Sequence, residues 1–273
     1  MGIINYKHFL ICEEKSVNTI KKYIRDVNRF LDFVGNRELS KEVTIEYKNH
    51  LISKEYEFSS INSMLASINT YFRFVERTDC IVKSIRVQRK PYCNEEKELT
   101  RQDYVRLIDT TRKQGNKRLE LIIQTICSTG IRVGELKYIT VEAVKMGEAR
   151  VALKGKVRYV FFVRKLRQKL LEYIKCMEIK SGPIFLTSTG KLLDRTNVWR
   201  EMKKLSIYAG VRPEKIFPHN LRHLFARIFY SMEKDIVKLA DLLGHSSINT
   251  TRVYIISTGY EHRKRMENMK LIT

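Results

Sequence analysis

The chain has 273 residues, enough for one large domain or for two modest domains that each bury a core. Its 43% hydrophobic and 30% charged residues exclude a disordered chain and are typical of a globular protein. The 52 Lys and Arg residues outnumber the 30 Asp and Glu residues and give a net charge of +22. This charge favours a polyanionic partner, most commonly nucleic acid, over an anionic membrane or a merely basic surface.

The five cysteines are widely spaced and include no C-x-x-C pair. This argues against a zinc cluster and a disulfide framework, and it suits a reducing cytoplasm. The N-terminus lacks the apolar core of a signal peptide, and no stretch approaches the roughly 20 apolar residues of a membrane span. We therefore predict a cytoplasmic protein with no membrane partner.

Residues 1–87 predict a small all-helical domain. Ser16 can cap a helix in which apolar residues recur at helical spacing as far as Val34. A second helix is predicted from about Lys41 to Ser53, and a third after Ser60 with one apolar face. Three or four short helices of this kind form an all-α unit.

The first and third of these predicted helices carry basic and polar residues opposite their apolar faces. A solvated face is one interpretation of this pattern, and a stripe that follows DNA phosphates is the other. On the second interpretation the candidate DNA-binding residues are Asn18, Lys22, Arg25, Arg29, Asn62, Ser63, Thr70 and Arg73.

Residues 88–98 break the helical pattern and form the predicted boundary between two domains. They are polar and contain Pro91, one of only four prolines. A linker here would let two basic domains close around a duplex. The second domain is then predicted over residues 99–273.

The second domain begins with a helix capped by Thr100, followed by an apolar helix from Leu119 to Cys127. A Ser-Thr-Gly sequence ends that helix, and Arg132 follows among apolar neighbours. A charge in such a place is costly unless it has a partner. Glu135, three residues further on, is the predicted partner that orients Arg132.

Residues 149–163 predict two strands joined near Gly155, because they are rich in β-branched and aromatic residues. Lys154 and Lys156 would lie at the tip of this hairpin. Exposed lysines at a turn are commonly only solubilising; the alternative is that both reach the nucleic acid.

Helices are predicted over about 163–178 and 196–209, and Pro218 favours the start of another. On that helix His219 and Arg222 share one face. His219 and His223 have the spacing of a metal pair, but no His-Glu-x-x-His pattern or third ligand accompanies them, so no metal is predicted.

The stretch 241–258 contains a Gly-His pair, and Tyr254 follows His245 by nine residues. A tyrosine near a helix end is most often an amphipathic core residue. It can also act as a nucleophile if a base takes its proton. The stretch by itself leaves both interpretations open.

Four blocks in this order resemble the tyrosine recombinase (phage integrase) family, in its simple two-domain Xer-like or transposon-type form. They are residues 129–136 around Arg132, the Lys-Gly hairpin, residues 218–223 with a His-x-x-Arg motif, and residues 243–254. The resemblance is weak over the N-terminal helices. The hairpin departs from it at Val160-Phe161-Phe162, where relatives often have Val-Pro-Leu, so Lys156 stays an alternative to Lys154.

The resemblance implies a mainly α fold with a small β-hairpin sheet, made of a helical core-binding domain and a catalytic domain. It implies transesterification of DNA through a 3′-phosphotyrosine, without metal, ATP or another cofactor. Two arginines would clamp the phosphate, a lysine would protonate the leaving oxygen, and a histidine would act as general base toward the tyrosine. The implied catalytic residues are Arg132, Lys154, His219, Arg222, His245 and Tyr254.

The implied partners are double-stranded DNA with paired inverted core sites, a homo-tetramer assembled on it, and an accessory protein or DNA. The implied location is the bacterial cytoplasm, at the nucleoid. The tail, residues 260–272, would dock on a neighbouring protomer or pack on its own domain. We expect no separate arm-type domain before the first helix. A catalytically silent DNA-binding protein of the same fold and a type IB topoisomerase are the rival interpretations.

Overall fold

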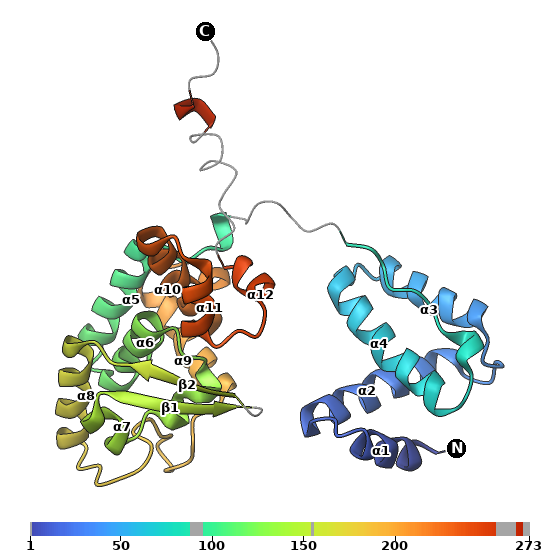
Figure 1. Cartoon of the computed structure of the whole chain (residues 1–273), viewed down its shortest axis with the longest axis horizontal. Helices are drawn as coiled ribbons and strands as arrows, with labels where there is room; N and C mark the ends of the chain where they lie inside the picture. The colour runs from blue at the N-terminus through green and yellow to red at the C-terminus, as the bar shows by residue number, and fades with distance from the viewer. Residues whose placement is uncertain (1, 88–94, 154–155, 255–265, 270–273) are drawn as a thin grey trace. The chain divides into compact units, whose positions relative to one another are not determined.

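The computed structural model describes residues 2–87, 95–153, 156–254 and 266–269 (Figure 1). The chain divides into two compact units, Met1–Arg89 and Lys90–Thr273. The predicted fold class, mainly helical with one small hairpin sheet, is confirmed. The predicted linker falls outside the described residues over 88–94, and the predicted docking tail does so except at 266–269.

The N-terminal unit is all-helical and encloses an aromatic core. Phe30 lies at its centre, with its ring centroid 5.2 Å from that of Tyr47 and 5.6 Å from that of Phe72. Ser16 caps the second helix by accepting a hydrogen bond from Thr19 N, as its sequence predicts. The elements are α1 (Ile3–Cys12), α2 (Val17–Val34), α3 (Lys41–Ser53), α4 (Phe58–Phe74) and the 3₁₀ turn η1 (Thr78–Cys80).

A buried carboxylate joins α2 to α4. Asp26 is almost fully buried, and its Oδ2 accepts hydrogen bonds from Lys22 Nζ at 2.5 Å and from Ser67 Oγ at 3.0 Å. Lys22 Nζ also donates to the Ser63 carbonyl at 2.9 Å. A buried charge needs such partners, so Lys22 holds the two helices together.

Two asparagines of α4 hold the segment that leaves this unit. Asn62 donates to the Ile85 carbonyl at 2.9 Å and accepts from Ile85 N at 2.7 Å. Asn69 makes the same pair of bonds with Val82, at 2.9 and 3.2 Å. Each amide therefore pairs with backbone in the way a neighbouring strand would.

The C-terminal unit contains the predicted helices and hairpin, together with short helices that the sequence did not indicate. Its helices are α5 (Arg101–Lys113), α6 (Lys117–Thr129), α7 (Val141–Met146), α8 (Arg164–Cys176), α9 (Arg195–Tyr208), α10 (Pro218–Glu233), α11 (Ile236–Leu243) and α12 (Ile248–Arg252). Three 3₁₀ turns accompany them: η2 (Glu95–Lys97), η3 (Val133–Tyr138) and η4 (Pro213–Lys215).

The hairpin pairs β1 (Glu148–Leu153) with β2 (Lys156–Phe161) in antiparallel register, from Glu148 opposite Phe161 to Leu153 opposite Lys156. Val160 of β2 is buried, whereas Val157 and Tyr159 are half exposed, which is the alternation expected of a strand with one covered face. The covered face packs on α7 beside α8, and β2 also contacts α11 (Figure 1). The turn at Lys154 and Gly155 lies outside the described residues.

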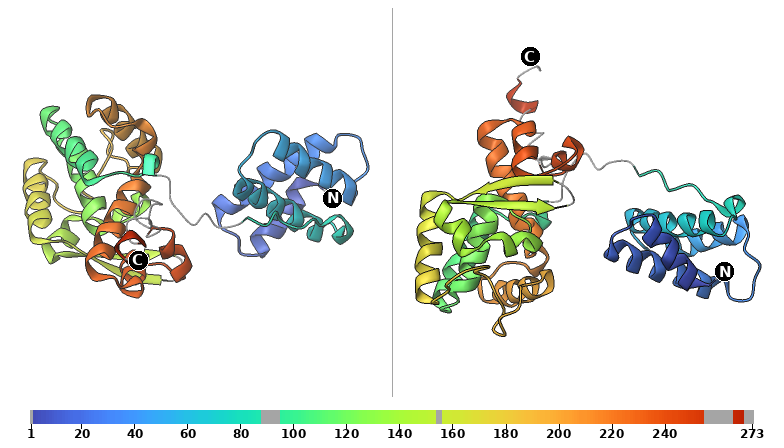
Figure 2. Two further views of the ribbon diagram at one scale, coloured as in Figure 1. Left: turned by 90° about the horizontal axis from the view of Figure 1, so that it is seen from above. Right: turned by 60° about the horizontal axis from the view of Figure 1, so that its bottom comes forward.

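Helix α10 packs along α6, and α10, α11 and α12 lie together in every view (Figure 2). Helix α6 ends at Gly130, whose φ of 64° is left-handed and favours glycine. The backbone then turns into η3, which carries Arg132 at its start. These packed ends bring the stretches around Arg132, Arg222 and Tyr254 together in one place.

Candidate active site

Arg222 lies on α10 and is completely buried. Its guanidinium donates to the Gly130 carbonyl, to the Leu243 carbonyl at 2.6 Å and to His245 Nε2 at 2.9 Å. Its Nε is buried and has no hydrogen-bond partner among the described residues. Burial, followed by the charge of Arg132, lowers the pKa of Arg222 to about 10. Within the described parts of the chain, this buried cation has no ion-pair partner, and its Nε remains a free hydrogen-bond donor.

Glu135 orients Arg132, as predicted. Its Oε1 accepts from Arg132 Nη1 at 2.9 Å, and its Oε2 accepts from the Arg132 backbone N at 2.9 Å. Burial by itself would raise the pKa of Glu135, but these bonds and the charge of Arg158 hold that pKa below its ordinary value. Arg132 itself stays partly exposed and faces the cavity.

Arg158 is a site residue that the sequence interpretation missed. Its Nη2 donates to Glu135 Oε2 at 2.5 Å, and its Nη1 donates to the Leu242 carbonyl at 2.7 Å. It therefore connects β2 both to the partner of Arg132 and to the end of α11. Strand alternation gives the signal that was overlooked: Arg158 is two residues from buried Val160 and shares its face, where a charge needs a partner.

Gly244→Ala is expected to destabilise the C-terminal unit by roughly 2–4 kcal/mol, from left-handed strain and overpacking together. Gly244 has a φ of +63°, and a Cβ there would lie 2.8 Å from Arg158 Nε and closer still to its Cδ. Arg158 cannot withdraw without losing its bonds to Glu135 and Leu242. Urea unfolding followed by the fluorescence of Trp199 measures the loss.

Gly210→Ala is the matched control for this substitution. Its φ is +58°, but nothing lies within 4 Å of the position a Cβ would take. It should therefore show only the left-handed strain, about 1–2 kcal/mol. Equal losses for the two variants would show that Arg158 does not confine Gly244.

Tyr254 is buried and in contact with histidines of its own chain. Its Oη lies 3.0 Å from His219 Nε2, and its ring centroid lies 4.2 Å from that of His223. The Arg222 guanidinium carbon lies 6.0 Å from the centre of the tyrosine ring. A neutral imidazole nitrogen at this distance can accept the phenolic proton.

His245 is held by both ring nitrogens. Because arginine only donates, His245 Nε2 accepts from Arg222, which leaves the proton on Nδ1 to donate to Thr251 Oγ1 at 2.9 Å. Burial and the charge of Arg222 lower the pKa of His245 to about 4, in agreement with a neutral ring. The backbone carbonyl of Thr251 accepts a hydrogen bond from Tyr254 N at 2.9 Å, so Thr251 contacts both His245 and the tyrosine.

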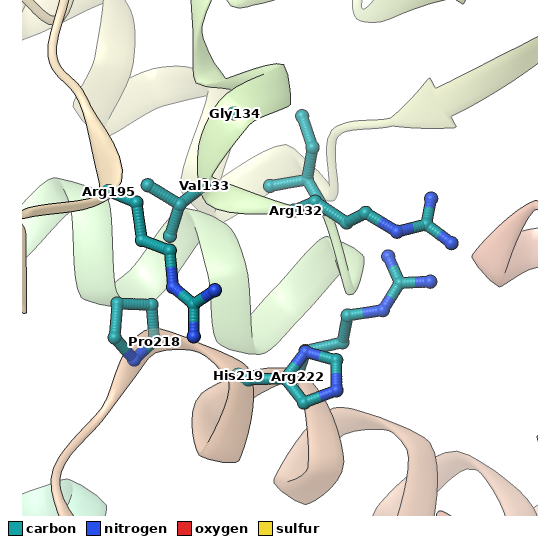
Figure 3. A pocket seen from close by; sticks show the side chains of 8 residues that line it. Arg132, Val133, Gly134, Arg195, Pro218, His219 and Arg222 are labelled. Carbon is teal, nitrogen blue, oxygen red and sulfur yellow. The ribbon is translucent and has the colours of Figure 1, made fainter. Parts of the chain in front are cut away.

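A cavity of about 320 Å³ opens beside these groups (Figure 3). Arg132 and Arg222 extend into it from facing elements with their guanidinium groups side by side, and the His219 ring stands next to Arg222. Arg195, the first residue of α9, also lines the cavity and was not among the predicted residues. Two aligned guanidinium groups beside a phenol are suited to a phosphate diester.

The structure thus brings together five of the six predicted catalytic residues: Arg132, His219, Arg222, His245 and Tyr254. Lys154 lies outside the described residues, and Lys156 is the first residue of β2. Within the parts of the chain that the structure describes, no three His, Cys, Asp or Glu side chains are placed to hold a metal ion. In the same parts, no helix is long and apolar enough to cross a membrane.

Some of the predicted DNA-binding residues of the N-terminal unit are engaged within the fold, and others are exposed. Lys22 and Asn62 are engaged in bonds that hold the unit together. Arg29 donates to Tyr56 Oη at 2.5 Å on the surface, and Thr70 bonds within α4. Exposed side chains of this set are Asn18, Arg25, Arg29, Ser63 and Arg73.

Comparison with known proteins identifies both units. The profile of the phage integrase family matches residues 97–259, and that of the phage integrase N-terminal SAM-like domain matches residues 3–79. Tyrosine recombinase XerA of Thermococcus onnurineus is 30% identical over 277 residues, which cover 99% of this chain and 95% of that protein.

Tyrosine recombinase XerH of Campylobacter jejuni is 36% identical over 153 residues, which cover 52% of this chain and 42% of that protein. A crystal structure of a lambda integrase(75–356) dimer bound to a COC′ core site has the same fold. Its TM-score is 0.76 at 15% identity, and 93% of each chain is covered.

Proposed function

The chain belongs to the phage integrase family of tyrosine recombinases, and from this we propose that it cleaves and rejoins double-stranded DNA at specific sites through Tyr254. The observation that carries the proposal is the 3.0 Å contact between Tyr254 Oη and His219 Nε2, next to the cavity that Arg132 and Arg222 line. A nucleophile, its base and two phosphate-binding cations thus meet in one chain.

In the proposed reaction His219 Nε2 accepts the phenolic proton as Tyr254 Oη attacks phosphorus. The bond from phosphorus to the 5′ oxygen breaks, and a 3′-phosphotyrosine and a 5′-hydroxyl are formed. By family resemblance Lys154, or Lys156 in its place, gives the leaving oxygen its proton. The reverse attack by a 5′-hydroxyl rejoins the strand, so the bond energy is retained.

Arg132 and Arg222 stabilise the charge that develops on the non-bridging oxygens during this reaction. The buried Nε of Arg222 is a donor that a phosphate oxygen would satisfy. His245 can also donate to the phosphate only if its Nε2 gains a proton. The hydrogen bond that Nε2 now accepts from the Arg222 guanidinium must then break. An anion beside the ring favours this protonation.

The pH profile of cleavage is expected to fall on its acid side, at pH values below 6.5. Burial, and then the charges of Arg222, Arg195 and Arg132, lower the pKa of His219 from its ordinary 6.5. A general base works only when unprotonated, so kcat/KM should fall as the pH drops through this lowered pKa and be level above it. Cleavage rates at sub-saturating DNA over a pH series measure this fall.

His219→Gln is the control for the pH profile. It should remove most of the activity and, with it, the titration, because glutamine does not ionise in this range. An acid-side fall that persists unchanged in His219→Gln, or one that lies above pH 6.5 in the unmodified protein, would contradict the assignment of His219 as the base.

We extend the proposal to assembly and partners. The lambda integrase structure is of a dimer bound to a core site, which supports core-site DNA and a multimeric assembly as partners here. We propose that this DNA carries paired inverted core sites and that the assembly is a homo-tetramer. An accessory protein or DNA segment, a tail that docks in trans, and a cytoplasmic location at the nucleoid belong to the same proposal. In the N-terminal unit, direct DNA contacts fall to the exposed residues, because Lys22 and Asn62 are engaged within the fold.

Covalent capture tests the function directly. A pool of nicked duplexes with randomised sequence is incubated with the protein, and DNA that stays attached after denaturation is recovered and sequenced. We expect an inverted-repeat site and a peptide modified at Tyr254. No adduct with any duplex would favour the catalytically silent alternative, and relaxation of supercoiled DNA without sequence preference would favour the topoisomerase alternative.

A further inference from the structure

Arg195 enters the active-site cavity from a different element than the other arginines. It is the first residue of α9, whereas Arg132 precedes η3 and Arg222 lies on α10. In Figure 3 its guanidinium lies on the other side of the His219 ring from the paired guanidinium groups of Arg132 and Arg222. Arg195 therefore serves a separate part of the cavity.

No contact within the described residues accounts for the guanidinium of Arg195. Its position in the first turn of α9 gives the charge no favourable interaction with the helix dipole, whose positive end lies there. The helix start is already satisfied by a capping box between Asp194 and Asn197. Among the described residues, no hydrogen bond or ion pair involves the Arg195 guanidinium, and its side chain is exposed to the cavity.

The described residues of the site carry more positive than negative charge, enough to bind more than one anion. Glu135 is the carboxylate that pairs with Arg132 and Arg158, while Arg222 is bonded only to carbonyls and a ring nitrogen. The charge of Arg195 reaches His219, whose pKa is lowered by burial first and by Arg222 and Arg195 next. A DNA strand that places one phosphate between Arg132 and Arg222 brings its neighbouring phosphates with it.

We propose that Arg195 binds the phosphate adjacent to the one that Tyr254 attacks, on the cleaved strand. This contact sets the register in which the strand enters the cavity, since two phosphates held by separate cations leave it no freedom to slide. The inference rests on the proposed strand cleavage and adds a second phosphate site to it.

The test combines a protein change with a change in the DNA. Two nicked duplexes are made with the sequence recovered by covalent capture. Each carries one uncharged methylphosphonate, at one or the other of the two phosphates next to the scissile phosphate. Single-turnover cleavage of each duplex is measured with the unmodified protein, with Arg195→Gln and with Arg164→Gln. Arg164 is the matched control because it is also an exposed arginine at the first position of a helix, α8, but does not line the cavity.

Arg195→Gln should slow cleavage of the unmodified duplex on the order of tenfold or more, as expected for a lost charged hydrogen bond. One methylphosphonate position should slow the unmodified protein to a similar extent and slow Arg195→Gln hardly further, which is the signature of a direct contact. Arg195→Lys should recover part of the loss. Thermal unfolding of both glutamine variants should match that of the unmodified protein.

Two results would overturn the proposal. In one, Arg195→Gln cleaves as fast as Arg164→Gln. In the other, the methylphosphonate slows Arg195→Gln by the same factor as it slows the unmodified protein, at both of the neighbouring phosphates. A failure of the proposed function looks different, because the unmodified protein would then form no adduct on the unmodified duplex.

Discussion

Tyr254→Phe should reduce covalent attachment to a nicked duplex to background, on the order of a million-fold, as removal of the nucleophile does in other covalent catalysts. The substitution deletes one oxygen and keeps the ring that packs on His223. Stability should change by only about 0.5–1.5 kcal/mol, because only the hydrogen bond to His219 is lost. Cleavage and thermal unfolding of the same preparation measure the two effects.

Tyr208→Phe is the matched control for this variant. Tyr208 ends α9 on the surface of the same unit and is far more exposed than Tyr254. It should form the adduct at the normal rate. An adduct with Tyr254→Phe would show that another residue attacks, and a failure of Tyr208→Phe would show that the assay reports folding instead of chemistry.

Arg222→Met is expected to slow cleavage by a hundredfold or more while changing the free energy of unfolding by less than about 2 kcal/mol. Loss of its bonds to the Gly130 and Leu243 carbonyls destabilises the unit by about 1 kcal/mol or more each. Against this, the pKa of Arg222 is lowered to about 10 from 12.5, so burial and the repulsion of Arg132 together disfavour the charge by roughly 3 kcal/mol. The two effects nearly offset each other.

This variant therefore separates function from stability. Cleavage is measured on the nicked duplex, and unfolding is measured in urea without DNA. Arg200→Met, an exposed change on α9 outside the cavity, should alter neither quantity. If Arg222→Met unfolds several kcal/mol more easily, Arg222 is mainly a structural residue; if it cleaves normally, it does not bind the scissile phosphate.

The sequence predicted the features that depend only on residues close together in the chain. The caps at Ser16 and Thr100 and the pairing of Arg132 with Glu135 three residues away are of this kind. The hairpin was predicted because residues 149–163 are rich in β-branched and aromatic types on both sides of Gly155. Helix α1 was missed because its start has no side-chain cap and its apolar residues lie on all sides.

Contacts between distant segments could not be predicted. Arg158 meets Glu135 and Leu242 only after the hairpin folds onto α11, and Arg195 meets the cavity only when α9 packs beside η3. The basic face of α2 has a periodicity that suits DNA, yet Lys22 of that face turns to buried Asp26. Helical periodicity gives the direction of a side chain but not what packs there.

The contact between Tyr254 and His219 within one chain has a genetic consequence. Because the proposed nucleophile, its proposed base and both arginines come from the same polypeptide, we expect that two different inactive alleles, one changed at Tyr254 and one at Arg222, cannot build a working site between them. Co-expressed, they should show no intragenic complementation. Either allele should instead be dominant negative, because its product reduces the activity of assemblies that it forms with the intact protein.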